Sequence, residues 1–92
     1  MRQVEIRSHL YEIEKNQGDC FRLDDVKDKV TDYFDEYDYI FGDYSYDKLR
    51  LKGFNNKTNK HYRKINGIEG LDTYIEEFCS YGAKYFLLKK IK

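Results

Sequence analysis

Aromatic and cationic side chains gather in the middle of the chain. The set comprises Tyr44, Tyr46, Lys48, Arg50 and Lys52. Rings beside Lys and Arg on an exposed strand form a surface on which single-stranded bases stack while the cations hold phosphates. This pattern favours a non-enzymatic module that binds RNA or a ribonucleoprotein, with the downstream residues Lys60 and Arg63 extending the basic surface. The alternative interpretation is a solvated strand face whose tyrosines cover one end of a sheet.

The distribution of charge supports a second hypothesis, a protein adaptor. The formal net charge is zero, yet residues 1–46 hold 6 Lys and Arg against 12 Asp and Glu, whereas residues 47–92 hold 11 against 5. Opposite patches attract a partner over about 8 Å at physiological salt. Such a protein would dock through an acidic helix at residues 24–35 or through its dipolar surface. The same charges would neutralise one another if the two halves pack face to face.

Carboxylates near the aromatic and cationic segment suggest a third class, a metal-dependent hydrolase. Asp38, Asp43 and Asp47, with Lys52, supply the groups that a metal-dependent nuclease uses. Their spacing matches no metal motif, and carboxylates beside a turn commonly cap backbone amides. We therefore predict no catalytic residue, no bound metal and no cofactor.

The cysteines and glycines indicate structural roles. Cys79 and His61 form a nucleophile pair on paper, but Cys79 falls on the apolar stripe of a predicted helix and is expected to be buried. Cys20 and Cys79 lie far apart in the sequence and belong to no Cys-x-x-Cys pair, so both are predicted to be reduced thiols. The glycines fit neither the Walker nor the dinucleotide-binding spacing. Nucleotide-dependent catalysis is not indicated.

Hydrophobic periodicity in the first half predicts strands around one helix. Residues 4–7 and 10–14 form two short strands or one bent strand, because apolar and polar residues alternate. From residue 23 to residue 37 the apolar residues recur at helical intervals, which predicts a single amphipathic helix. The apolar run at residues 39–41 predicts a buried strand that ends in a turn at residues 42–43.

The clearest alternation in the chain lies at residues 48–52. Leu49 and Leu51 are predicted to point to one side of a strand and the three cations between and around them to the other. We expect Gln at all three cationic positions to leave the fold intact. The polar residues 55–59 predict a hairpin loop or a longer mobile loop, and residues 61–65 predict a weaker returning strand.

The remaining residues complete the predicted fold class. A second helix carries an apolar stripe from Ile68 to Cys79 and is capped by Gly82, and residues 83–92 form a strand in the centre of the sheet. The sequence thus predicts a small single α+β domain over residues 1–92, with a mixed or antiparallel sheet of about five strands and two helices packed on it. No run approaches the roughly 20 apolar residues of a membrane span, and the start lacks a secretory signal, so we predict a cytoplasmic protein without a membrane partner.

Residues 37–54 also carry a family resemblance. This segment contains, in order, an aspartate, a tyrosine, an apolar pair, Gly-Asp, aromatic residues and then Leu-Arg-Leu-Lys-Gly-Phe. The segment resembles the central signature of the YutD-like family, and residues 11–21, 74–79 and 85–88 resemble its first strand and turn, its last helix and its last strand. The resemblance implies a small α+β fold and a cytoplasmic bacterial protein, and it implies no particular activity.

Overall fold

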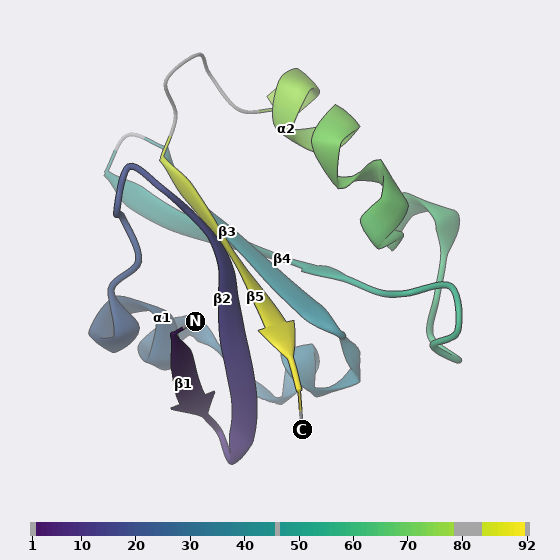
Figure 1. The fold of residues 1–92 in the computed structure, drawn as a ribbon, viewed down its shortest axis with the longest axis horizontal. Helices are drawn as coiled ribbons and strands as arrows, with labels where there is room; N and C mark the ends of the chain where they lie inside the picture. The colour runs from purple at the N-terminus through teal and green to yellow at the C-terminus, as the bar shows by residue number, and fades with distance from the viewer. Residues whose placement is uncertain (1, 46, 79–83, 92) are drawn as a thin grey trace.

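A five-stranded antiparallel sheet forms the centre of the protein (Figure 1). The computed structural model describes residues 2–45, 47–78 and 84–91 of the 92-residue chain. The strands are β1 (Gln3–Ile6), β2 (His9–Gln17), β3 (Tyr39–Ser45), β4 (Lys48–Phe54) and β5 (Tyr85–Lys90), and their order in the sheet is β1-β2-β5-β3-β4. The C-terminal strand β5 is central, which confirms the prediction. Its consecutive residues Phe86, Leu87 and Leu88 are all buried, because both faces of the sheet are covered there.

Helices cover the two faces of the sheet from opposite sides (Figure 1). Helix α1 (Leu23–Lys29) and the 3-10 helix η1 (Asp32–Glu36) pack on one face, and α2 (Leu71–Phe78) packs on the other after the short 3-10 helices η2 (Lys64–Asn66) and η3 (Ile68–Gly70). The core under α1 and η1 is the larger and includes Tyr11, Phe21, Val26, Phe34, Ile40, Leu49, Phe86 and Leu88. The core under α2 is built from Tyr39, Phe41, Phe54, Leu71 and Leu87. The predicted α+β class with two helices on one sheet is confirmed.

The prediction of one continuous helix from residue 23 to residue 37 is wrong. The helix stops at Lys29, because Val30 and Thr31 adopt extended backbone, with ψ of 120° and −178°. Both residues are β-branched, which lowers their preference for helix, and the buried side chain of Val30 packs into the core. The chain then re-enters a 3-10 turn that places Phe34 against the sheet. The apolar spacing correctly predicts that Val30 and Phe34 are buried, but it misses the break between them, and it includes Tyr33, which is 59% exposed.

Two further local predictions are corrected by the structure. Strand β3 continues through Gly42 and Asp43 to Ser45, so the turn predicted at residues 42–43 is absent, and Asp47 in the hairpin has φ of 62°. Residues 61–65 form no strand. The Asn59 side chain organises turns there instead, accepting from the His61 amide at 2.7 Å and donating to the Glu36 carbonyl at 3.2 Å. The predictions for Cys79 and Gly82 lie outside the described residues.

The buried phenol of Tyr11 gives the fold a dependence on alkaline pH. Burial, together with the nearby Asp35 carboxylate, raises the pKa of Tyr11 from 10.0 to about 12. The unfolded chain loses this proton near pH 10, so the stability contributed by the neutral phenol is complete below pH 10 and is lost as pH rises toward 12. We expect the urea midpoint of Tyr11→Phe to fall less than that of the wild type between about pH 9 and about pH 11.5. Equal falls would contradict this role of Tyr11.

No described helix combines the length and the apolar character that crossing a membrane requires.

Candidate binding surface along strand β4

Strand β4 is one edge of the sheet. Within the described part of the chain it pairs only with β3, in a hairpin whose register runs from Ser45 opposite Lys48 to Tyr39 opposite Phe54. Leu49 and Leu51 pack against the larger core on the α1 side. Because side chains alternate along a strand, the Cβ atoms of the three cations of β4 point to the α2 side, although Lys48 and Arg50 also border the space between β4 and α1. The predicted alternation of residues 48–52 is therefore confirmed.

Arg50 is bound to a buried carboxylate on the neighbouring strand. It stands directly opposite Asp43, with its Nε donating to Oδ1 at 3.1 Å and its Nη2 donating to Oδ2 at 2.5 Å. Asp43 is only 4% exposed, whereas the Arg50 side chain is 53% exposed. A bidentate guanidinium is the cation best suited to compensate a buried carboxylate, since two parallel hydrogen bonds fix its geometry. Arg50 therefore has a structural role in addition to the one predicted for it.

Lys52 lies over two aromatic rings. Its Nζ is 5.1 Å from the ring centroid of Phe54 and 5.6 Å from that of Tyr74 on α2. An ammonium at this distance over a ring face is attracted by the negative charge of the π-system. Tyr74 in turn contacts Phe41 and Phe54 edge-on, with ring centroids 5.6 Å apart in each case. Lys52 thus covers the aromatic layer that joins β4 to α2.

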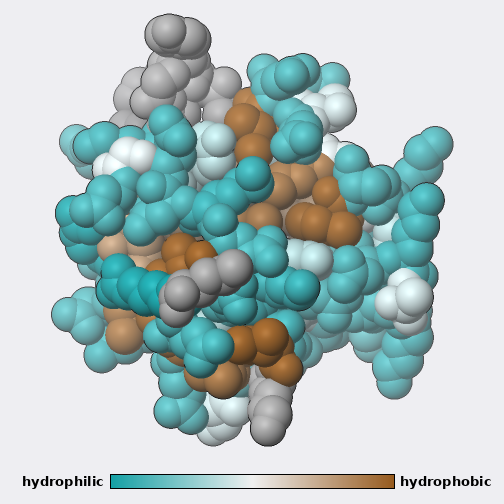
Figure 2. Space-filling view, viewed as in Figure 1, coloured by the Kyte–Doolittle hydropathy of each residue, from teal (hydrophilic) through white to brown (hydrophobic). Residues whose placement is uncertain are grey.

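A partly apolar groove of about 420 Å³ follows the end of β4 on the α2 side. Phe54 and Tyr74 lie in it, with Lys52 and Glu77 among its charged residues. Ile65, in the middle of η2, also lines the groove and is 81% exposed. The space-filling view shows hydrophobic side chains below α2 on this face of the molecule (Figure 2). The groove therefore offers an accessible apolar contact beside charged groups.

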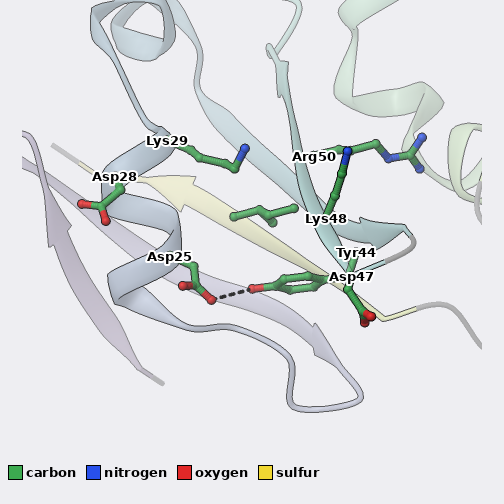
Figure 3. A pocket seen from close by; sticks show the side chains of 8 residues that line it. Asp25, Asp28, Lys29, Tyr44, Asp47, Lys48 and Arg50 are labelled. Carbon is green, nitrogen blue, oxygen red and sulfur yellow. Dashed lines mark hydrogen bonds between the residues drawn. The ribbon is translucent and has the colours of Figure 1, made fainter.

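A second and more polar groove, of about 930 Å³, lies between β4 and α1 (Figure 3). Asp25 and Asp28 reach it from α1, and Tyr44, Asp47 and Lys48 reach it from the β3–β4 hairpin. The Tyr44 hydroxyl donates to Asp25 Oδ2 at 3.5 Å. Burial raises the pKa of the Tyr44 phenol, and the Asp25 carboxylate raises it further. The edge of β4 is thus flanked by a groove on each face of the sheet.

The structure brings some of the residues predicted to bind RNA together and separates others. Tyr44, Lys48 and Arg50 line the groove between β4 and α1, although the Arg50 guanidinium points away from α1 (Figure 3) and lies with Lys52 on the α2 side. Lys60 and Arg63 line a polar pocket beyond the opposite end of β4 from Lys48, together with Glu36 and with His61, whose Nδ1 is 3.6 Å from Glu36 Oε2. Tyr46 lies outside the described residues. The RNA-binding role of this set stays a prediction.

Two of the carboxylates considered for a metal site, Asp38 and Asp43, are engaged in other contacts. Asp38 Oδ2 accepts a hydrogen bond from the Asn56 amide at 2.9 Å, and Asp43 binds Arg50. No three His, Cys, Asp or Glu residues of the described chain are arranged to hold a metal ion. The sequence pattern did not predict the pairing of Asp43 with Arg50. Its only signal was the position of the two residues on neighbouring strands.

Comparison with known proteins extends over almost the whole chain. The family model described as "Putative antitoxin YutD-like" matches residues 5–89. The chain is similar to the "Putative antitoxin YutD" of Bacillus subtilis (strain 168), with 39% identity over 87 residues that cover 95% of this chain and 96% of that protein. It is also similar to the solution NMR structure of protein yutD from B. subtilis, with a TM-score of 0.81 and 37% identity, over 100% of this chain and 84% of that one. The likeness therefore extends over the fold as a whole.

Proposed function

The chain belongs to the YutD-like family, and from this premise we propose that it is a non-enzymatic module that binds a partner protein. The descriptions of the family model and of the B. subtilis relative both read "Putative antitoxin". A protein that counteracts a toxin acts by recognition, and this favours a macromolecular partner over a small substrate. Fold alone carries no function, so the proposal depends on the surface of the protein as well.

The observation that carries the proposal is the pair of grooves along the exposed edge of β4. Each combines apolar or aromatic contacts with charges of both signs, and aromatic residues and Arg are enriched at the centre of protein interfaces. Asp25, Asp28 and Asp47 line the groove that holds Tyr44. Lys29, Lys48 and Arg50 line the same groove. If a base stacked on the Tyr44 ring, its phosphate would meet these carboxylates as well as the cations, and the carboxylates would weaken its binding. The surface therefore suits a protein better than a nucleic acid, and it includes part of the acidic helix considered for an adaptor.

RNA is a second candidate, favoured by a separate surface. The segment after β4 exposes four cations, Lys57, Lys60, Arg63 and Lys64. Cations in this number bind a phosphate backbone mainly by releasing counterions, without sequence preference. Lys64 also lines the groove on the α2 side, but Lys60 and Arg63 line neither groove, so substitutions at these two residues separate the candidates by experiment.

Affinity purification from the source organism, with and without ribonuclease, tests the proposal. We expect a protein partner that stays bound after ribonuclease treatment. When the two purified proteins are mixed, light scattering should show a complex of defined stoichiometry. Replacing Lys60 and Arg63 with Gln should leave that complex intact. The RNA function would instead be established by two results together. Ribonuclease would remove all partners, and the affinity for RNA would depend steeply on salt and fall in Lys60→Gln and Arg63→Gln.

A further inference from the structure

The geometry points to the mode of recognition: we propose that an extended segment of the partner, with acidic and apolar residues in alternation, adds to the sheet as a sixth strand beside β4. This inference rests on the proposed function and names the chemistry of the partner. An edge strand presents a row of backbone N–H and C=O groups that a further strand can pair with. Of the two edges, β4 has seven residues and β1 has four, so β4 offers the longer template, about 23 Å.

The two grooves explain how side chains of an added strand would be accommodated. Successive residues of that strand point to opposite faces of the sheet, so they would enter the α1-side and the α2-side grooves in turn. Both grooves are lined by residues of β4 itself, Leu49 on the α1 side and Lys52 and Phe54 on the α2 side. The side chain of Lys48, whose Cβ points to the α2 side, also borders the α1-side groove. The edge of β4 is thus bordered by accessible space on both faces, as strand addition requires.

The side chains of β4 define the sequence that would pair with it. On the α2 side, Lys48 and Lys52 favour carboxylates directly across from them, because opposite charges in cross-strand positions attract. On the α1 side, Leu49 and Leu51 favour apolar neighbours. At the end of the strand, Phe54 and the exposed Ile65 provide contacts for one further apolar side chain. The matching segment therefore alternates acidic and apolar residues.

A second copy of this chain is a poor occupant of the same edge. Antiparallel pairing of two β4 strands would place Lys48, Arg50 and Lys52 opposite the same three cations, and like charges in cross-strand positions are destabilising. Lysines on an exposed edge are a common device against such self-pairing. These lysines therefore disfavour self-association while leaving an acidic strand acceptable.

A synthetic peptide tests the inference without knowledge of the partner. The probe is a seven-residue capped peptide that alternates Glu with Val, titrated into the isotope-labelled protein and followed by NMR. We expect the backbone amides of residues 48–54 to shift and intermolecular contacts to connect them with the peptide. A peptide alternating Lys with Val, and the Glu-Val peptide with alternate amides N-methylated, should bind more weakly because each lacks one half of the recognition. Shifts confined to other residues, or self-association through β4, would overturn the inference.

Charge-reversed variants sharpen the test. Lys48→Glu, on the exposed end of β4, should lower the affinity for the Glu-Val peptide about fivefold, whereas the control Lys57→Glu, in the exposed segment beyond β4, should not change it. If a purified partner protein binds wild type and Lys48→Glu equally and leaves the amides of β4 unshifted, strand addition is wrong while the proposed function stands. If no protein forms a complex that survives ribonuclease, the proposed function fails whatever the peptide does.

Discussion

Gly42→Ala should destabilise the protein by about 3 kcal/mol, because the new methyl group would overlap the Phe86 ring. A Cβ at position 42 would lie 2.1 Å from Cζ of Phe86 and within 2.7 Å of two further ring atoms. Phe86 is fully buried in the central strand and packs edge-on against Phe21 at 5.1 Å between centroids. In an interior packed to crystal density the ring cannot move aside without displacing its neighbours. The cost therefore falls at the upper end of the range for overpacked cores.

Gly70→Ala is the matched control for this prediction. A Cβ at Gly70 meets nothing within 4 Å, so the same substitution there should change stability by less than about 1 kcal/mol. Both variants are measured by urea denaturation, where a shift in midpoint at constant slope reports stability. A Gly42→Ala midpoint equal to that of Gly70→Ala would show that the Phe86 ring yields.

Gly42 also shows why part of the sheet escaped prediction from the sequence. A glycine followed by an aspartate is a frequent turn signal, and it suggested that the strand ended there. In the structure the glycine serves close packing within β3, since its missing side chain makes room for Phe86 from β5, more than forty residues later in the chain. Local composition does not distinguish the two uses of glycine. Long-range packing decides between them.

The alternating strand at residues 48–52 was predictable because its pattern is local. Leu49 and Leu51 face a core and the cations face the other side, as period-two alternation requires. The partners of those cations were not predictable, since they depend on register. Because a turn is predicted at residues 42–43, Asp43 falls outside the predicted strand, and its contact with Arg50 cannot be predicted. The distribution of the predicted RNA-binding residues over two faces of the sheet follows from the same register.

Alternation alone led to the expectation that Gln at residues 48, 50 and 52 leaves the fold intact, and the position of Asp43 revises it. We expect Arg50→Gln to destabilise the protein by about 2 to 3 kcal/mol. Removing one member of a buried ion pair leaves the other without its compensating charge, and Asp43 is 4% exposed. The cost lies below that of a fully buried pair, because the Arg50 side chain is half exposed in the native protein.

A double-mutant cycle separates this pairing from the general effect of losing a cation. Lys48→Gln, on the same face of β4 and exposed, should change stability by less than about 0.5 kcal/mol. Asp43→Asn combined with Arg50→Gln should be more stable than the sum of the single losses predicts, since the amide leaves no charge to compensate. The coupling energy comes from urea denaturation of four proteins: wild type, Asp43→Asn, Arg50→Gln and the double variant. Additive losses would show that the two side chains are not coupled, and the three cations of β4 would then be equally available to a partner.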